Sequence, residues 1–454
     1  MPVRMLVGLS PTAFFFITTF LILATIPNHA LADTVISPNA YISEDTVWTK
    51  DGNPYFIQDD LTVEQNTTLF IEPGVVVQSG SSSWIDVFGR LIASGTSDEP
   101  ILFTSATSDW GGIVFYNTET SSSLDNVIVR YADSISDFYS KDLSISNARV
   151  ENGDLGIRAY GSHLSLNNFS AENISSDAMD ISSGSDVVLK NIILKNVRSG
   201  IEVYVGSKAD ISNLFVDHSQ NEALAAYVGS SVRIASSTIT NARYAVEVFN
   251  NSSADISNLT TNEISRGDAL AIFDHSEMTL NDSSIFNTNY YDAIMVANSG
   301  SLTARNVKIS NSSGDGVVVF AGGSVDMRDS VISGFYYAGV ADYGSSSSYP
   351  ANFLSLTNNE IKNNYTGISL YSNNSSYAIS NNSIHDNDSY GLDSHGTEVV
   401  DVSQNFWGDP SGPYNNPDNL FGTGDEVFYS RGSVLFSPWL TSWGALPTCC
   451  SNVL

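Results

Sequence analysis

The chain has 454 residues, with 49 acidic against 19 basic side chains and a net charge of −30. Such a surface excludes nucleic acid as a partner, because phosphate binding needs clustered Lys and Arg. It also disfavours an acidic polysaccharide unless cations bridge the two. The only two cysteines, Cys449 and Cys450, are adjacent, so no disulfide framework holds the fold. A chain of this length must therefore find its stability in a continuous core.

The first residues have the pattern of an export signal. Arg4 is the only charged side chain before the apolar stretch 13–26, and Ala30-Leu31-Ala32 supplies the small residues that a signal peptidase reads. The stretch is shorter than the ~20 residues that span a bilayer. We therefore predict a cleaved signal peptide over residues 1–32 and an extracytoplasmic protein that is secreted, periplasmic or at the cell surface. An uncleaved membrane anchor is the alternative.

One pattern recurs from Leu124 onward. An aliphatic residue is followed two positions later by a small polar residue, usually Asn, and three positions further by another aliphatic residue. The polar residue returns every 21 to 24 residues, with one interval of 29. It is Asn126, Asn147, Asn168, Asn191, Asn213, Ser236, Asn258, Asp282, Asn306, Asp329, Asn358, Asn381 and Gln404. The residue two before each of these is apolar, which predicts a repeat architecture.

A further strand shares this period. Its expected inward residues are Ile157, Met179, Ile201, Leu224, Val246, Leu270, Ile294, Val317, Val340, Ile368 and Leu392. One interval is 28 residues long and contains the Ser-rich segment from Gly344 to Pro350. Insertions in a solenoid bulge from one face without disturbing the stack. We expect this segment to be such a loop.

These repeats predict an all-β protein, a single-stranded right-handed parallel β-helix of about 15 coils. Short strands rich in Val and Ile cannot bury their apolar side within one coil, but coils stacked ~4.8 Å apart can. The recurrent Asn fits a bend between strands, because Asn tolerates left-handed backbone angles. Amides stacked on successive coils can also bond to one another as an asparagine ladder. Replacing Asn213 by Leu is expected to leave polar groups unpaired at a buried bend.

The domain boundaries follow from the repeats. We expect the N-terminal cap and first coils over residues 33–123, the regular repeats over 124–407, and a C-terminal cap and tail over 408–454. The open edges of a solenoid invite pairing with other chains. The segment before Leu61 and the run 407–439 are therefore expected to cover the two ends and keep the protein a monomer.

Motifs at both ends resemble a known group. The segments 52–57 (GNPYFI), 71–77 (IEPGVVV), 101–106 (ILFTSA) and 110–115 (WGGIVF) are similar to the start of bacterial and archaeal right-handed β-helix surface proteins. The segments 405–414 (NFWGDPSGPY) and 436–440 (FSPWL) resemble their closing part. The relatives include NosD-type and other pectin-lyase-like, carbohydrate-associated repeats. This resemblance implies the architecture, while the fold itself carries lyases, hydrolases, adhesins and inert spacers.

The chemistry of these families transfers poorly to this chain. No Arg is followed two residues later by Pro, as pectate-lyase-like sites require, and Ser394-His395-Gly396 is only a partial match to the Gly-His-Gly of polygalacturonase-like sites. NosD-type proteins are linked to copper. The histidines after the predicted signal are scattered, at His163, His218, His275, His385 and His395. The methionines after the predicted signal, Met179, Met278, Met295 and Met327, are interpreted mostly as core residues.

An aromatic column accompanies the further strand, three residues after each inward position. It contains Tyr160, Tyr204, Tyr227, Phe249, Phe273, Phe320, Tyr343, Tyr371 and His395, with Ser182 and Ala297 as exceptions. Strand alternation points these side chains outward. One interpretation is a platform for sugar rings, in which Tyr204, Tyr227 and Phe249 are parallel and largely exposed. The other is that the rings only shield the sheet.

A charged column runs beside the aromatic one, with Arg158, Asp180, Glu202 and Glu247 one residue after their inward neighbours. Asp180 and Glu202 fall on adjacent coils, where two carboxylates are close enough for a retaining glycosidase pair or for a shared calcium ion. An acidic surface also produces such pairs by chance. No other cofactor is expected.

Three functions remain open from the sequence. The preferred one is non-enzymatic binding of a polysaccharide or cell-envelope glycan by an exported β-helix, or a rigid surface scaffold. The second is a polysaccharide lyase or glycoside hydrolase that uses Asp180, Glu202 and Arg158 in the outward groove. The third is a passenger or spacer of a larger assembly.

Overall fold

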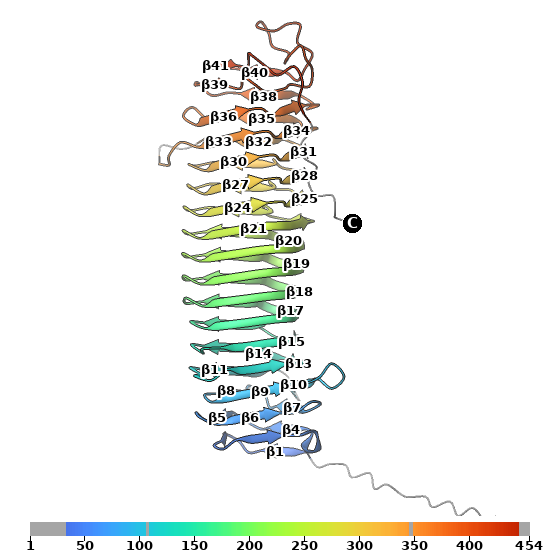
Figure 1. Ribbon diagram of the computed structural model, residues 1–454, viewed down its shortest axis with the longest axis vertical. Coiled ribbons are helices and arrows are strands. Elements are labelled where there is room, and N and C mark those ends of the chain that lie inside the picture. The colour runs from blue at the N-terminus through green and yellow to red at the C-terminus, as the bar shows by residue number, and fades with distance from the viewer. Residues whose placement is uncertain (1–32, 106–108, 345–347, 445–454) are drawn as a thin grey trace, which may run out of the picture.

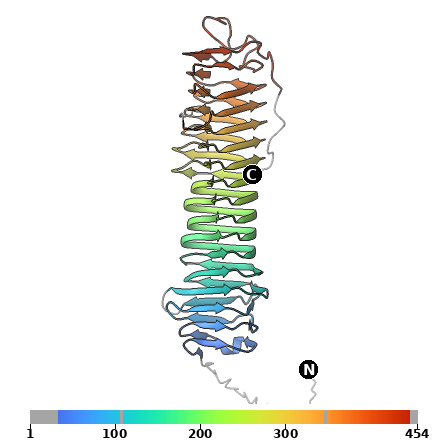
Figure 2. The same ribbon diagram turned by 90° about the vertical axis from the view of Figure 1, so that its left-hand side faces the viewer.

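A computed structural model describes residues 33–105, 109–344 and 348–444. The predicted signal peptide and the pair Cys449 and Cys450 lie outside these residues. The chain winds into a parallel β-helix, a long rod with β1 at one end and β39 to β41 at the other (Figure 1). The turned view in Figure 2 shows the same stack of coils from the side. The predicted fold class is therefore confirmed.

Three parallel sheets, here called A, B and C in their order along each coil, run the length of the rod. Sheet A contains β3 (Thr46–Trp48), β6 (Thr68–Ile71), β9 (Arg90–Ser94), β12 (Ser122–Asp125), β24 (Glu277–Asn281), β27 (Ser301–Arg305), β30 (Ser324–Arg328), β33 (Phe353–Thr357) and β36 (Ser376–Ser380). Sheet B contains β1 (Thr34–Ile36), β4 (Tyr55–Ile57), β7 (Val76–Ser79), β10 (Ile101–Ser105), β13 (Val127–Arg130), β25 (Ser284–Asn289), β28 (Lys308–Ser312), β31 (Val331–Phe335), β34 (Glu360–Lys362) and β37 (Ser383–His385). The short strand β22 (Ile264–Ser265) follows the bend after sheet B and pairs with the last residues of β25. Sheet C contains β2 (Ala40–Ile42), β5 (Leu61–Val63), β8 (Trp84–Val87), β11 (Trp110–Tyr116), β14 (Ala132–Phe138), β16 (Ile157–Tyr160), β23 (Leu270–Ile272), β26 (Ile294–Val296), β29 (Val317–Val319), β32 (Ala338–Asp342), β35 (Thr366–Leu370), β38 (Tyr390–Ser394) and β40 (Val427–Tyr429).

Strands in the middle of the rod continue around the bends and so belong to more than one sheet. They are β15 (Leu143–Glu151), β17 (His163–Ser182), β18 (Asp186–Tyr204), β19 (Lys208–Tyr227), β20 (Ser231–Phe249) and β21 (Ser253–Asn262). The remaining pair, β39 (Val399–Asp401) and β41 (Ser433–Leu435), lies near the C-terminal end. The 3-10 turn Lys50–Gly52 is the only helical element of the described residues, and none of them forms a helix long and apolar enough to cross a membrane.

The core lies inside the coils, as the repeat predicts. Every apolar residue two positions before the recurrent Asn is buried, and so is every expected inward residue of sheet C. Register pairs such as Ile201 with Leu224 stack like on like in successive coils. The coils therefore share one continuous hydrophobic core, which buries the apolar side that a single coil leaves open.

The bend between sheets A and B is where the recurrent polar residue sits. All thirteen of its positions have positive φ, between 49° and 63°, and they lie in one column. Side-chain amides in this column bond to the neighbouring coil: Asn168 Nδ2 donates to Asn147 Oδ1 at 3.0 Å, and Asn213 Nδ2 donates to Asn191 Oδ1 at 3.0 Å. The expectation of a buried bend is wrong, however. Asn213 is exposed, because its side chain points outward at the corner of the coil.

A second left-handed bend, between sheets B and C, was not predicted. It falls five residues after the first, and its residues also have positive φ, as at Asn152, Asn173, Asn196 and Asn241. Asn173 Nδ2 donates to Asn152 Oδ1 at 3.0 Å, and Asn196 Nδ2 donates to Asn173 Oδ1 at 3.3 Å. This bend leads the chain from sheet B into sheet C.

Buried polar columns satisfy the backbone inside the corners. Ser207 Oγ accepts a hydrogen bond from Ser185 N at 3.2 Å, and Ser230 Oγ accepts one from Ser207 N at 3.1 Å. Toward the C-terminal end Asn359, Asn382 and Asn405 form a fully buried amide column. In each coil a buried side-chain oxygen thus accepts a hydrogen bond from a backbone N–H of the neighbouring coil, because a buried N–H needs a partner.

The insertion behaves as predicted in its described part. On either side of it β30 and β33 stay in register, with Met327 opposite Leu356. The ends of the loop are tied by the buried carboxylate of Asp342, whose Oδ1 accepts hydrogen bonds from Gly344 N at 2.7 Å and from Asn352 Nδ2 at 2.6 Å. The loop therefore leaves the stack undisturbed.

The two ends differ from each other. Within the described residues, the segment before Leu61 adds one more coil to the stack, with β1, β2 and β3 each paired to the next coil, so it is not the lid that we expected. At the other end Trp407 is fully buried, and Trp439 Nε1 donates to Pro410 O at 3.1 Å. The chain after Trp407 loops over the last coils (Figure 1).

Candidate functional site

The outer face of sheet C carries the predicted aromatic column. Tyr204, Tyr227 and Phe249 follow one another on β18, β19 and β20, and their ring centroids are 5.0 Å apart at each step. The ring planes of Tyr204 and Tyr227 are inclined to each other by 2°, and those of Tyr227 and Phe249 by 1°. The predicted parallel arrangement of these three rings is confirmed.

The prediction that these rings are largely exposed is wrong. All three are half-buried, because each ring covers a face of its neighbour and turns an edge toward solvent. Sugar rings stack on aromatic faces. This comb of rings, defined as Tyr204, Tyr227 and Phe249, therefore offers edges and hydroxyl groups along most of its length.

The aromatic column extends beyond the residues that the sequence singled out. Before Tyr160 it includes Phe88, Tyr116 and Phe138, with centroids 5.0 Å and 5.7 Å apart along that series. Their spacing could have revealed them, because each ring lies three residues after a buried inward residue, at Ile85, Ile113 and Ile135. Toward the C-terminal end Tyr371 stacks on Tyr343 at 5.6 Å and on His395 at 5.0 Å.

Two predicted aromatic residues do not stack with this column. Phe273 is half-buried and Phe320 is 45% exposed. Ala297 lies between them in the column and supplies no ring. The predicted stripe is therefore divided into separate stacks.

The predicted charged column lies beside the comb. Register pairs place Arg158 next to Asp180 and Asp180 next to Glu202 on consecutive strands. Arg158 Nε is 3.6 Å from Asp180 Oδ2. The Tyr227 hydroxyl donates to Glu202 Oε2 at 2.7 Å, which fixes that carboxyl group against the comb. The structure thus brings the three candidate catalytic residues together.

A second column of carboxyl groups was missed by the sequence analysis. It lies two residues before the inward positions of sheet C and contains Asp177, Glu222, Asp268, Asp292 and Asp315. Asp292 N donates to Asp268 Oδ1 at 3.1 Å, and Asp315 N donates to Asp292 Oδ1 at 2.8 Å. Its spacing could have revealed it, since acidic residues recur two positions before the inward residues of sheet C at the repeat period. We call this second column, together with Asp180, Glu202 and Glu247 of the charged column, the acidic face.

Crowding raises several pKa values on the acidic face. Burial, and then the nearby Asp177 and Glu222, raise the pKa of Glu202 to about 7 even though the Tyr227 hydroxyl opposes the shift. Burial, Glu222 and Asp268 raise the pKa of Glu247 to about 7. Burial, with Asp268 and Asp315, raises the pKa of Asp292 to about 7. These groups are therefore partly protonated at neutral pH and can both donate and accept hydrogen bonds.

Metal binding by this face has limited support in the geometry. Among the described residues no group of three or more His, Cys, Asp or Glu side chains is placed to hold a metal ion. Calcium takes six to eight oxygen ligands, so Asp180 and Glu202 would need further oxygens from a ligand. The copper of NosD-type proteins does not fit either. His163 and His218 are on different coils, and Met179 is buried in the core.

The remaining candidates from the sequence, His395 and the methionines, make contacts within the fold. His395 Nδ1 is 2.8 Å from Ser430 Oγ, and His395 Nε2 is 3.0 Å from Asp393 Oδ1. Met278 and Met327 are buried in the core, while Met295 packs against a small outer cluster that contains Val318. The partial match at Ser394-His395-Gly396 therefore lies at the end of an aromatic stack.

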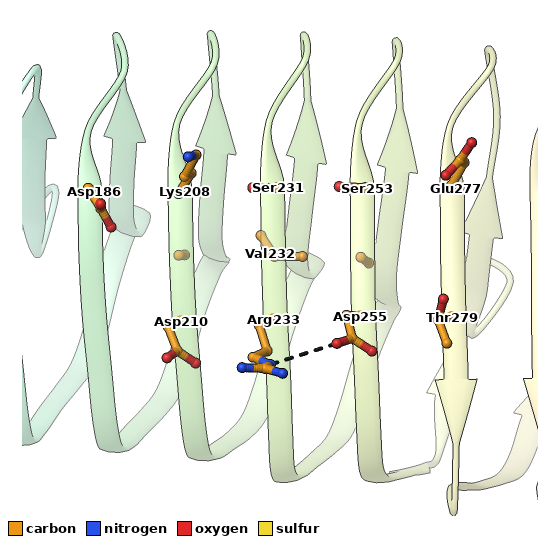
Figure 3. Close-up of a pocket in the computed structure, with 12 residues that line it drawn as sticks. Asp186, Lys208, Asp210, Ser231, Val232, Arg233, Ser253, Asp255, Glu277 and Thr279 are labelled. Carbon is orange, nitrogen blue, oxygen red and sulfur yellow. Dashed lines mark ion pairs between the residues drawn. The ribbon is translucent and has the colours of Figure 1, made fainter.

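A charged hollow of about 450 Å³ lies on the outer side of sheet A (Figure 3). Asp210, Arg233 and Asp255 follow one another on adjacent strands there, and Arg233 Nε is 3.7 Å from Asp255 Oδ2. Lys208 lies opposite Asp186 in the register. Because oppositely charged residues face each other across several adjacent strands, this surface favours the observed coil register. Its lining has four acidic and two basic side chains and so keeps a net negative charge.

Comparison with known proteins agrees with this architecture. The family model described as "Right handed beta helix region" matches residues 206–354 and 244–407, and the "Pectate-lyase like beta helix domain" model matches residues 40–127. The chain is a right-handed β-helix repeat protein. A third model, "Periplasmic copper-binding protein (NosD)", matches residues 97–262 of this β-helix. No curated protein sequence matches the chain.

Solved structures with similar folds are distant. An alginate lyase from Paenibacillus sp. str. FPU-7 is 15% identical with a TM-score of 0.36, over 53% of this β-helix and 88% of that chain. The catalytic domain of a GH87 α-1,3-glucanase with bound tetrasaccharides is 14% identical with a TM-score of 0.42, over 69% of this chain and 64% of that one. The Vag8–C1 inhibitor complex contains a chain that is 13% identical with a TM-score of 0.48. This similarity covers 89% of this chain and 100% of that one. Similarities at this level support no statement about activity.

Proposed function

We propose that this β-helix is an extracytoplasmic protein that binds uncharged polysaccharide along its acidic face without cleaving it. The observation that carries the proposal is the gathering of carboxyl groups beside the comb. The raised pKa values mean that the ionised forms of these carboxyl groups lower the stability of the folded chain at neutral pH. The fold itself therefore gains nothing from placing them together. Carboxyl groups held at a cost in this way are a feature of functional sites.

The chemistry of the face favours sugar hydroxyl groups. Glu202 is oriented by the hydrogen bond from the Tyr227 hydroxyl, and Glu247 is half-buried beside the comb. Partly protonated carboxyl groups can pair with hydroxyls in either direction. Uronate or sulfate groups would meet like charge here, because Arg158 is the only basic residue in the charged column. The ring edges and the hydroxyl of Tyr204 border the same surface. An uncharged chain lying along the rod fits these properties.

The extracytoplasmic location rests on sequence features. The apolar stretch 13–26 followed by Ala30-Leu31-Ala32 supports export. The matched NosD model describes a periplasmic protein. Expression of the full chain and N-terminal sequencing of the released protein test this part: a mature terminus at Asp33 supports it, and a chain that retains Met1 contradicts it.

A second candidate function is retaining glycoside hydrolysis. It is favoured by the pairing of Asp180 with Glu202 across adjacent strands, ~4.8 Å apart, close to the separation that retaining enzymes use. A carboxyl group with a pKa of about 7 also suits a general acid. In this role Glu202 would protonate the leaving oxygen and Asp180 would attack the anomeric carbon.

Two assays on the mature chain separate the candidates. A glycan array of uncharged and uronate-containing polysaccharides tests binding, and release of reducing ends from the same panel tests cleavage. Binding of uncharged chains without new reducing ends supports the proposal. Turnover that Glu202→Gln abolishes supports the hydrolase instead. Repeating the array with EDTA tests whether calcium bridges Asp180 and Glu202 to the sugar.

A further inference from the structure

An open groove of about 860 Å³ lies at the bend between sheets B and C, near the C-terminal end of the rod. Tyr336, Tyr337 and Tyr365 form its walls. We propose that this groove is a second binding site for uncharged oligosaccharide, separate from the acidic face. It is placed on coils where the comb of Tyr204, Tyr227 and Phe249 is absent. The proposal goes beyond the function proposed above, since it needs none of the acidic residues of sheet C.

The tyrosines of the groove expose ring faces, whereas those of the comb expose mainly ring edges. Tyr336 is 70% exposed, and Tyr337 and Tyr365 are each 55% exposed. Tyr336 and Tyr337 meet edge to face, with planes at 86° and centroids 5.1 Å apart. This arrangement leaves ring faces open to the groove, where the comb has only edges. Apolar sugar faces stack on such open rings.

Gly334 opens the groove by interrupting a column of amides. It occupies the second left-handed bend with φ +79°, at the position that Asn311 holds one coil before and Asn363 holds one coil after. A Cβ at Gly334 would lie 2.7 Å from Asn311 Oδ1. In other coils an Asn at this bend bonds to its neighbour, as Asn173 does to Asn152. The missing side chain leaves a gap in that column.

The gap leaves two amides available to a ligand. Asn311 and Asn363 are exposed, and within the described part of the chain their side chains have no hydrogen-bond partner. A planar amide offers two donors and an acceptor with two lone pairs, a set that matches the vicinal hydroxyls of a sugar. Two unpaired amides flanking open aromatic rings therefore specify a ligand with both apolar faces and hydroxyl edges.

The residues of the groove floor and the charge at its edge favour an uncharged ligand over an anionic one. The floor is formed by small or buried residues, with Ser312 and Phe335 both nearly fully buried. Among the described residues that line the groove there is no Lys or Arg, and Asp388 at its edge repels anionic chains. An uncharged hexose oligomer satisfies the rings, the amides and the charge together.

Titration calorimetry of the mature chain with cellohexaose, laminarihexaose, maltohexaose and mannohexaose tests this site. We expect at least one oligomer to bind. Tyr336→Ala/Tyr365→Ala should weaken that binding about tenfold or more, since each ring contributes on the order of 1 kcal/mol. Gly334→Asn should abolish it by completing the amide column, while keeping the fold, because Asn adopts the left-handed backbone and only the end of the Asn311 side chain has to move.

Matched variants separate this site from the acidic face. Tyr131→Asn removes an exposed tyrosine from the same bend column far from the groove and should leave binding unchanged. The groove variants are also made in the Glu202→Gln/Glu247→Gln background, which removes the site proposed on the acidic face: oligomer binding that persists in this background and is lost with Gly334→Asn belongs to the groove, whatever the fate of the function proposed above. The inference is overturned if wild type binds none of the four oligomers, or if folded groove variants bind as tightly as wild type. Capture of a polypeptide in place of the oligomers also overturns it.

Discussion

The Tyr227 hydroxyl donates a hydrogen bond of 2.7 Å to Glu202 Oε2 on the preceding coil. This contact joins the aromatic column to the carboxyl groups of the same face. It commits the hydroxyl to a protein partner, while the face of the Tyr227 ring is committed to Phe249 and Tyr204. The comb therefore holds the acidic face in shape, and the carboxyl groups are the parts left to contact a ligand.

Tyr227→Phe removes the donor from Glu202 and keeps the ring. Because that hydrogen bond favours the ionised carboxylate, the pKa of Glu202 should rise above its value of about 7, by about one unit or more. A carboxyl-carbon NMR titration of the wild type and the variant measures the shift. Tyr371→Phe, on a distant coil, is the control and should leave Glu202 unaffected. An unchanged or lower pKa in Tyr227→Phe would contradict the assignment of this contact.

The stability of the protein should fall as the pH rises from 5 to 8. The carboxyl groups of Glu202, Glu247 and Asp292 have folded pKa values of about 7, above their ordinary values of 4.5 and 3.8. The folded chain therefore binds more protons than the unfolded chain between these values, and the stabilisation present at low pH is lost through pH 7. After allowance for solvent screening, each group contributes on the order of 1 to 2 kcal/mol.

Urea unfolding at pH 5 and pH 8 measures this effect. The triple variant Glu202→Gln/Glu247→Gln/Asp292→Asn keeps the side-chain shapes and should show a much smaller difference between the two pH values. Equal stability of the wild type at both pH values, or greater stability at pH 8, would show that these carboxyl groups are not held at a cost.

The first left-handed bend can be tested at Asn213, which has φ 56° and an exposed side chain. Asn213→Leu loses the 3.0 Å bond to Asn191 Oδ1 and places a γ-branched residue in a left-handed conformation. The free energy of unfolding should fall by about 1 to 2 kcal/mol. Asn213→Gly should cost less, because Gly adopts this conformation without strain. If Gly costs as much as Leu, the backbone conformation does not decide the choice of residue at this bend.

The buried amide column should be less tolerant than the exposed one. Asn382 is fully buried, donates to Leu356 O at 2.8 Å and to Asn405 Oδ1 at 3.0 Å, and accepts from Asn359 N at 2.8 Å. Asn382→Leu keeps the volume but leaves these partners unpaired, at about 1 to 3 kcal/mol for each. We expect a loss of at least about 3 kcal/mol in urea unfolding. A loss no greater than that of Asn213→Leu would contradict this ranking.

The period and the core were predictable from sequence because every coil repeats one physical requirement. An inward position such as Ile201 must be apolar, since it packs on its equivalents above and below. The bend at Asn213 was likewise visible, because few residues tolerate positive φ. Its exposure was not visible, because the conformation alone does not say toward which side the corner turns.

The surface was harder to predict because it depends on angles between neighbouring coils. Counting positions placed Tyr204 and Tyr227 on one outward column, but not with their faces closed against each other. The second bend and the gap at Gly334 escaped notice, because Gly in a repeat dominated by Asn gives no signal until its neighbours are known. Asp292 and its equivalents belong to the acidic face only because the second bend turns them onto sheet C.

The most direct test of the account is calorimetry of the mature chain with an uncharged polysaccharide identified on the array, comparing wild type with Glu202→Gln/Glu247→Gln. Both substitutions preserve shape and remove two of the carboxyl groups of the acidic face whose pKa is raised to about 7. If the acidic face binds the polysaccharide, the variant stays folded and binds at least about tenfold more weakly, and the wild-type affinity varies with pH around 7. Equal affinities of the two proteins at pH 5 and pH 8 would contradict it.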